Sequence, residues 1–224
     1  MEFQNKEEIY SKVRLGIFNK EEAFYDFSKI PIIDRNSFVL CPIVINDTNY
    51  VEQNPTVNMA DSEFINKFGL NDKEILDFAI KNSTEHYPGI VKTVMDFVDN
   101  PPSMIPDGIV MPQIYVITNE DLFHGAAALI YQPQLLENIA NLTNKDIAIF
   151  LTDKNCVHCI PVSDSEQVLE YQEIYRNAME GIENILSADV LHYDAKNKLI
   201  KDLGGNVIET IRVQQIENKT HLRR

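Results

Sequence analysis

Three prolines and a glycine interrupt the chain near its middle, within the nine residues Asn100–Gly108 (NPPSMIPDG). Proline fixes φ, removes a backbone N–H and restricts the residue before it, so this stretch forbids a regular helix or strand. The chain has 224 residues, enough to bury a core on each side of such a break. We therefore predict a mostly helical N-terminal lobe with a short strand region over residues 1–106, a C-terminal α+β lobe over 107–203 and a basic tail over 204–224.

The N-terminal half carries mainly helical patterns, in which a capping side chain precedes apolar residues spaced three or four apart. One continuous apolar run, Phe38–Ile45, predicts a buried strand instead, and Pro42 within it indicates a sheet edge or a bulge. Four helices are predicted. The first runs through Phe24 and Phe27 after an Asn19–Glu22 capping box, and the second runs from Asp61 to Gly69. The third begins at Asn71 and Glu74 and turns Ile75, Leu76 and Ala79 toward the core, and the fourth follows Pro88, with Val91, Val94, Met95 and Val98 at helical spacing.

The C-terminal half alternates strand and helix patterns. The order strand, helix, hairpin, helix, hairpin favours an α+β fold with a mainly antiparallel sheet and flanking helices over a doubly wound parallel sheet. The predicted elements are a strand at Ile114–Thr118, a helical stretch from His124 to Leu142 interrupted near Pro133, a strand at Asp146–Leu151 that a turn at Asp153–Asn155 folds back as a hairpin, a long helix behind a Ser163–Glu166 capping box with Val168, Tyr171, Tyr175, Ala178 and Ile182 repeating, and a hairpin of Val190–Tyr193 with Lys198–Ile200.

This second half resembles a bacterial family, domain of unknown function 5688, across roughly residues 60–201. The resemblance is most specific at Tyr115–Asn119, at Gly125–Ala127, in the hairpin around His158, and at Leu186, Ser187, Tyr193 and Asp194 near the end of the matching region. It implies no established activity, and proteins of that family are typically found in gut Firmicutes, often among mobile-element genes. The family's hairpin usually reads Ser-Ser-x-His-Glu, so Cys156 and Cys159 depart from its pattern while His158 keeps it.

The formal net charge of −14 is concentrated in the middle of the chain, because residues 101–194 hold 14 acidic and 3 basic side chains. Such a surface repels phosphate backbones, which argues against direct nucleic-acid binding. The simplest interpretation is a solvated acidic surface. A sharper alternative is an acidic mimic of DNA that occupies a DNA-binding protein.

The chain has three cysteines, an odd number that argues against a disulfide framework and fits a reducing compartment. Its first residues show no basic stretch followed by an apolar one, and no apolar run approaches the length of a membrane span. We therefore expect a cytoplasmic protein without membrane contact.

Cys156 and Cys159 have the C-x-x-C spacing of many metal and redox centres. On a strand, however, their side chains point to opposite faces, and no second Cys or His pair stands at ligand spacing. We expect no metal site and no cofactor. Gly125–Ala128 is like the start of a phosphate-binding helix, but it lacks the full glycine-lysine pattern, and close helix packing explains it better.

The remaining polar candidates lie beside strand ends and turns, where functional groups tend to be presented. They are His158, Asp121, His124, Tyr193 and Asp194. For each, capping, turn formation or core hydrogen bonding is the simpler explanation.

No established catalytic motif is present, so the leading hypothesis is a non-enzymatic module that binds another protein, in a mobile-element or host-defence setting indicated by the resemblance alone. The alternatives are a hydrolase-like enzyme that joins His158 to carboxylates from the turns, and the DNA mimic. Whether the chain binds a small molecule is left open by the sequence.

Overall fold

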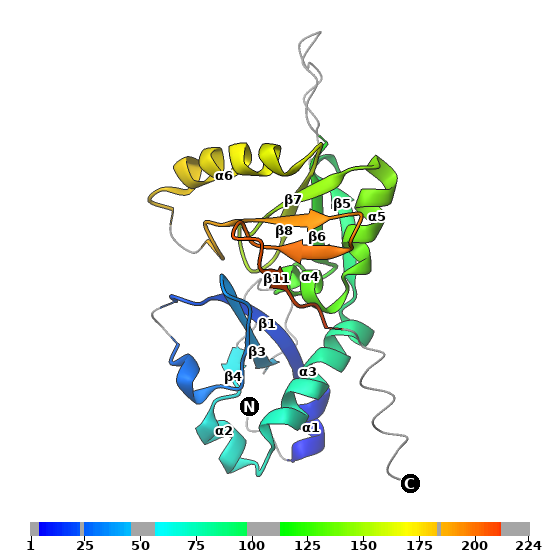
Figure 1. The fold of residues 1–224 in the computed structure, drawn as a ribbon. Helices are drawn as coiled ribbons and strands as arrows, with labels where there is room; N and C mark the ends of the chain where they lie inside the picture. Colours follow the sequence, from blue (N-terminus) through cyan, green and yellow to red (C-terminus); the bar gives the residue numbers. More distant parts are fainter. Residues whose placement is uncertain (1–4, 23–24, 46–56, 98–112, 183–184, 212–224) are drawn as a thin grey trace. The chain divides into compact units, whose positions relative to one another are not determined.

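A computed structural model describes residues 5–22, 25–45, 57–97, 113–182 and 185–211 (Figure 1). Within these residues the fold is α+β with two mostly antiparallel sheets and flanking helices, which confirms the predicted class. The chain divides into one unit of residues 1–88 and 211–224 and a second unit of residues 89–210. This division falls at Pro88 and Gly89 rather than after residue 106, and the proline-rich stretch Asn100–Gly108 lies outside the described residues.

The first unit is built on a four-stranded sheet in which β3 pairs with β1 along one side and with β2 and β4 along the other. The first unit is therefore less helical than predicted, because the sequence pattern did not predict strand β1. Its elements are α1 (Lys6–Lys12), β1 (Val13–Asn19), a 3-10 helix (Phe27–Lys29), β2 (Ile33–Asp34), β3 (Phe38–Ile45), β4 (Val57–Met59), α2 (Ser62–Lys67) and α3 (Asp72–His86).

Strand β3 is an inner strand, so the predicted edge position of Pro42 is wrong. Pro42 lies between the residues that pair with β2, Val39 and Leu40, and those that pair with β4, Ile43–Ile45. Its carbonyl oxygen still accepts a hydrogen bond from Ala60 N at 3.2 Å. Since the N–H and C=O of one residue point the same way in an antiparallel strand, the missing N–H removes only the last bond of the β3–β4 pairing.

Two of the four helices predicted in this half are confirmed. Asp61 caps α2 by accepting from Phe64 N, and the following Gly69 has φ of +56°. Asn71 caps α3, which buries Ile75 and Ala79.

The other two helix predictions are wrong. Asn19 ends β1, and its side chain accepts from Glu21 N, so it forms a turn rather than a helix cap, while Phe24 lies outside the described residues. After Pro88 the chain forms β5 (Gly89–Thr93) and then a 3-10 helix (Val94–Phe97). Pairing of β5 with the next strand of its sheet overrides the helical spacing there.

The second unit is a seven-stranded sheet with the strand order β11-β10-β9-β7-β8-β6-β5, every described pair being antiparallel. Its predicted order of strand, helix, hairpin, helix, hairpin is confirmed. The elements after β5 are β6 (Tyr115–Asn119), a 3-10 helix (Gly125–Ala127), α4 (Ala128–Tyr131), α5 (Gln134–Thr143), β7 (Asp146–Phe150), β8 (Val157–Val162), α6 (Ser165–Met179), β9 (Val190–Asp194), β10 (Leu199–Lys201) and β11 (Val207–Ile208).

Helices cover both faces of this sheet (Figure 1). On one face, Phe150 packs against Tyr171 and Tyr175 of α6, with ring centroids 5.9 and 5.2 Å apart. On the other face, Gly89 lies so close to α4 and α5 that a Cβ there would come within 2.6 Å of Ala128 and Leu135. Alternation along the strands therefore assigns each side chain to the α6 face or to the α4–α5 face.

The cap of α6 differs by one residue from the prediction. Asp164, not Ser163, is the N-cap, and its carboxylate accepts from Gln167 N at 3.0 Å. In turn, the Oε1 atom of Gln167 accepts a hydrogen bond from Ser163 N at 2.9 Å. The reciprocal pair of a capping box is present, moved one position along the chain.

In the described part of the chain, no helix has both the length and the apolar character needed to cross a lipid bilayer.

Candidate functional site

The five candidate residues fall at two opposite ends of the seven-stranded sheet. His158 lies opposite Phe150, at the end of β7, whereas Tyr193 lies opposite Ile147, near its beginning. Asp194 therefore stands beside Asp146, four residues from Phe150 along the same strand, a separation of about 13 Å. The structure does not bring His158 together with Tyr193 or Asp194.

At the first end, His158 is half-buried on the α6 face and its Nδ1 lies 2.9 Å from Thr152 Oγ1. Burial lowers the pKa of the His158 imidazole, partly offset by the charge of Asp153. The Asp153 carboxylate accepts from the backbone N–H groups of Asn155 and Cys156 and so closes the turn between β7 and β8. Burial thus favours the neutral imidazole, and its carboxylate neighbour Asp153 forms the turn.

The thiol of Cys156 is also unsuited to act as a nucleophile. Its Sγ lies 3.8 Å from Asp153 Oδ2. Burial, followed by the charge of Asp153, raises the pKa of Cys156 to about 11. A nucleophilic cysteine needs a depressed pKa and a cationic partner, and this site supplies neither. Cys159, on the opposite face of β8, is fully buried.

Asp121 and His124 lie in the loop that follows β6, at the same end of the sheet as the Asp153–Asn155 turn. Asp121 is exposed, while His124 is buried with φ of +50°. The backbone N–H of His124 donates to Asn155 Oδ1 at 3.2 Å, and Thr118 Oγ1 donates to Asn155 O at 2.7 Å. These contacts join the loop to the β7–β8 turn, so His124 serves the packing of the two connections.

The Gly125–Ala128 segment does not form an anion site. Ala126 N donates to Lys154 O at 3.2 Å and Ala127 N donates to His124 O at 3.1 Å, so these N–H groups have protein partners. A Cβ on Gly125 would lie 2.5 Å from Asn155 O. Close packing against the end of β6 and the β7–β8 turn, rather than against a helix, explains the glycine.

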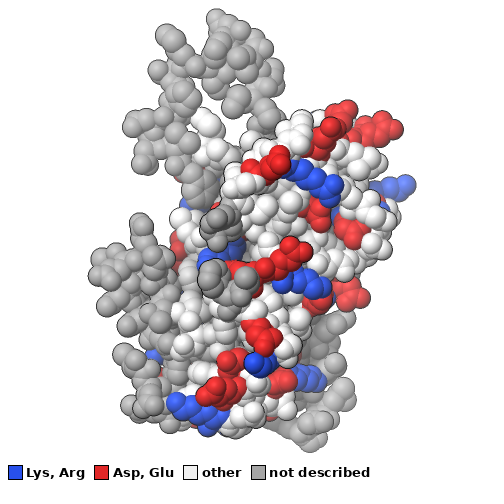
Figure 2. All heavy atoms as spheres, turned by 90° about the vertical axis from the view of Figure 1, so that its left-hand side faces the viewer, with Lys and Arg blue, Asp and Glu red and all other residues white. Residues whose placement is uncertain are grey.

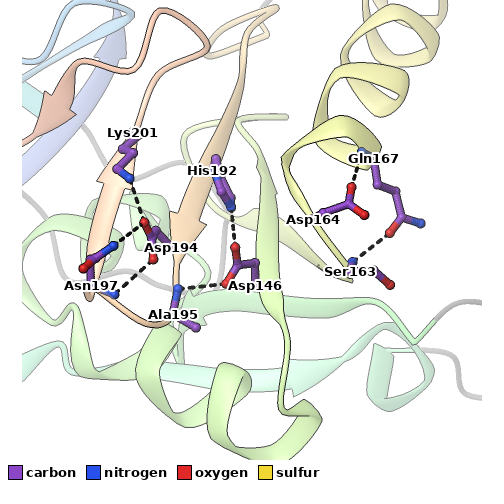
Figure 3. Close-up of polar contacts among 9 residues, drawn as sticks. All are labelled: Asp146, Ser163, Asp164, Gln167, His192, Asp194, Ala195, Asn197 and Lys201. Atoms are coloured by element: carbon purple, nitrogen blue, oxygen red, sulfur yellow. Dashed lines mark hydrogen bonds and ion pairs between the residues drawn. The ribbon is translucent and has the colours of Figure 1, made fainter.

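At the second end, Asp194 is held by a set of bonds shown in Figure 3. Its carboxylate accepts from the backbone and side-chain nitrogens of Asn197, at 3.0 and 2.8 Å, and pairs with Lys201 Nζ at 2.7 Å. The Asn197 bond, followed by Lys201, lowers the pKa of Asp194 below its usual range. The neighbouring Tyr193 points to the α4–α5 face and is buried, which raises its pKa to about 12.

A second carboxylate at this end was missed by the sequence analysis. Asp146 Oδ2 lies 2.8 Å from His192 Nε2, and Asp146 Oδ1 accepts from Ala195 N at 3.0 Å (Figure 3). The two partners are 46 and 49 residues away in sequence, so no local pattern signals the contact. Asp146 therefore ties β7 to β9 and to the turn after it.

An open hollow of about 570 Å³ adjoins Asp146. Its lining includes the exposed side chains of Lys145 and Lys196, and both carboxylate oxygens of Asp146 are engaged in contacts within the protein. Among the described residues, no group of three or more His, Cys, Asp or Glu side chains is placed to hold a metal ion.

The outward face of α6 exposes large aliphatic side chains. Leu169 and Ile174 are 56% and 63% exposed there, although both are large aliphatic side chains on a helix whose opposite face is buried. Three exposed carboxylates alternate with them, those of Glu166, Glu170 and Glu173, and no ion pair joins these to any described residue. We name these five residues the α6 outer face.

Acidic side chains elsewhere are interspersed with basic and uncharged ones on the surface drawn in Figure 2. Ion pairs such as Lys20–Asp34 and Lys198–Glu137 account for part of this mixture. Comparison of the chain with protein-family models, with curated proteins and with solved structures finds no match.

Proposed function

We propose that this chain is a non-enzymatic module that binds another protein, and that the α6 outer face is its binding surface. The proposal rests on one observation: Leu169 and Ile174 are each more than half exposed on α6, beside glutamates that form no ion pair with any described residue. Burial of two such side chains contributes up to about 1.5–3 kcal/mol each, enough to anchor a small interface.

The chemistry of this face fits a partner surface on which basic side chains lie between two apolar groups, because Glu170 and Glu173 lie between Leu169 and Ile174 on the helix. Each aliphatic side chain lies three or four residues from a glutamate, so an incoming cation and an incoming apolar group would be accommodated side by side. This mixture supports protein docking over DNA mimicry, because phosphate groups on a duplex are not interrupted by aliphatic groups.

The hydrolase-like alternative loses support from the arrangement of its residues. It needs His158 within hydrogen-bond or one-water reach of a catalytic carboxylate. Asp194 lies two strands from His158 and is displaced from it by about 13 Å along the strand direction, and Asp153 closes a turn.

We further propose a cytoplasmic location, supported by the three free cysteines, and membership of the family named above, supported by the quoted motifs. A mobile-element or host-defence setting would follow from that membership.

Affinity capture with the full chain tests the function. The double variant Leu169→Ser/Ile174→Ser should lose at least about tenfold of a specific bound protein, which corresponds to 1.4 kcal/mol. Leu142→Ser is the matched control, since Leu142 is 75% exposed on α5, away from the α6 outer face. Equal capture by both variants, or a bound protein without basic surface residues, would refute the proposal.

A further inference from the structure

We propose that the open hollow of about 570 Å³ beside Asp146 binds a small phosphorylated polyol, such as a sugar phosphate. The hollow lies at the end of the sheet where β7 begins and where β8 and β9 end, and Figure 3 shows three of its residues there, Asp146, Ser163 and Ala195. Its volume falls within the range of about 300–1,000 Å³ that is usual for small-molecule sites. The proposal does not depend on the proposed function, because the hollow and the α6 outer face share no residue.

Two lysines of the lining lack a counter-charge in the described part of the chain. Lys145 directly precedes β7, and Lys196 lies two residues after β9, a strand that pairs with β7 at a backbone separation of about 5 Å. Both side chains are exposed, and neither forms an ion pair with another described residue. Two like charges on one hollow repel each other, and an anion bound between them would relieve this repulsion.

The neighbouring carboxylates do not supply the counter-charge, because those drawn in Figure 3 have other partners. Asp146 contacts His192, and Asp194 pairs with Lys201. Asp164 caps α6. An external anion is therefore the partner that the two lysines of the hollow can take, and an ammonium group binds phosphate as a point charge.

The uncharged polar side chains of the lining match hydroxyl groups. Asn141, Asn144 and Ser163 are exposed at the hollow, and their side chains form no hydrogen bond to another described residue. A carboxamide and a hydroxyl both donate and accept, as the hydroxyl groups of a polyol do. The apolar part of the described lining consists of two alanines, so it offers a nucleobase no aromatic ring to stack on.

Nuclear magnetic resonance titration of the full chain with glucose 6-phosphate tests the site. We expect saturable binding in the millimolar range, with resonance shifts at the backbone amides of Lys145, Ser163 and Ala195. Glucose and inorganic phosphate each carry half of the ligand's groups and should bind more weakly, and so should AMP. No saturable binding up to about 10 mM, shifts only elsewhere in the chain, or tighter binding of any comparison compound would overturn the proposal.

Removal of the lysine charges separates a specific site from general attraction. Lys145→Gln and Lys196→Gln should each weaken glucose 6-phosphate binding about threefold, and the double variant should weaken it about tenfold. Lys154→Gln is the matched control, because Lys154 is an exposed lysine in the β7–β8 turn, at the opposite end of β7. An equal loss in the control and in the Lys145→Gln variant would contradict a site at the hollow.

Sedimentation with phosphatidylglycerol vesicles distinguishes a free ligand from a lipid headgroup of the same chemistry. The net charge of −14 opposes approach to an anionic bilayer, so the chain should stay in the supernatant. Co-sedimentation that glucose 6-phosphate prevents would assign the hollow to a headgroup and overturn the proposal of a free ligand.

Discussion

Cys156 has a carboxylate 3.8 Å from its sulfur and lies two residues from His158, and these neighbours make it inert rather than reactive. Asp153 opposes the thiolate by its charge, and burial opposes both the thiolate and the imidazolium. A cysteine next to a positive charge instead of a carboxylate would have a lowered pKa and could act as a nucleophile. Spacing alone therefore does not distinguish the two cases.

The rate of Cys156 alkylation should follow this pKa. With iodoacetamide and the folded chain, the rate should rise about tenfold for each pH unit toward pH 11, since only the thiolate reacts. Mass spectrometry of the modified peptide measures it, and the buried Cys41 and Cys159 serve as internal controls. A plateau at or below pH 8.5, the ordinary thiol value, would contradict the described environment.

Asp194 should contribute measurably to stability. Asp194→Ala removes an ion pair and two hydrogen bonds of a carboxylate that is 15% exposed, so the free energy of unfolding should fall by about 2 kcal/mol in urea at pH 7. Asp189→Ala, which removes the more exposed pair with Arg176, should cost about 0–1 kcal/mol.

The pH dependence of this contribution has a definite sign. Because the pKa of Asp194 is lower in the folded chain than the usual value of about 3.9, its stabilisation is full above pH 4 and is lost as the pH falls below it. The difference between wild type and Asp194→Ala should therefore shrink on acidification. A difference that grows at low pH would show that the carboxylate is not the stabilising species.

The loop after β6 and the β7–β8 turn form one packed element around Gly125. A methyl group there would lie 2.5 Å from Asn155 O and 2.6 Å from Asn119 N, both backbone atoms. Gly125→Ala should lower the free energy of unfolding by about 2 kcal/mol or more, because backbone must move. Gly204→Ala, whose nearest neighbours are side-chain atoms at 3.2 Å or more, should cost under about 0.5 kcal/mol in the same denaturation experiment.

The elements that could be predicted from sequence are those with a local signal. Asp61 and Asn71 cap their helices as their spacing indicates, and the continuously apolar runs at Phe38–Ile45 and residues 147–150 lie in strands. Strand β1 contains Arg14 and Gly16, which break its apolar pattern, and it is completed by contacts from α3, where Ser83 Oγ accepts from Leu15 N at 2.8 Å. Such distant contacts have no local signature.

The candidate site was less predictable than the fold for the same reason. His158 and Asp194 were grouped because both lie beside strand ends or turns, but register separates them, and register is a property of the sheet. Leu169 and Ile174 were overlooked because the inward spacing of α6 drew attention to Val168 and Tyr175. Aliphatic residues that fall off the inward stripe of an amphipathic helix are the signal that could have identified the α6 outer face.

At the scale of the whole chain, charge and exposed apolar surface are coupled. The net charge of −14 repels acidic partners, while the α6 outer face combines acidic side chains with two exposed aliphatic ones. A basic partner would thus be drawn by long-range attraction and retained by burial, and salt would slow association more than it speeds dissociation.

Site-specific photocrosslinking tests the central claim most directly. A photoreactive amino acid replaces Leu169 in one full-length variant and Leu142, on α5, in a matched control. We expect position 169 alone to crosslink one protein with a basic surface, and the addition of Glu173→Lys to abolish the product. Identical products from both positions, or a product insensitive to Glu173→Lys, would contradict a binding surface on α6.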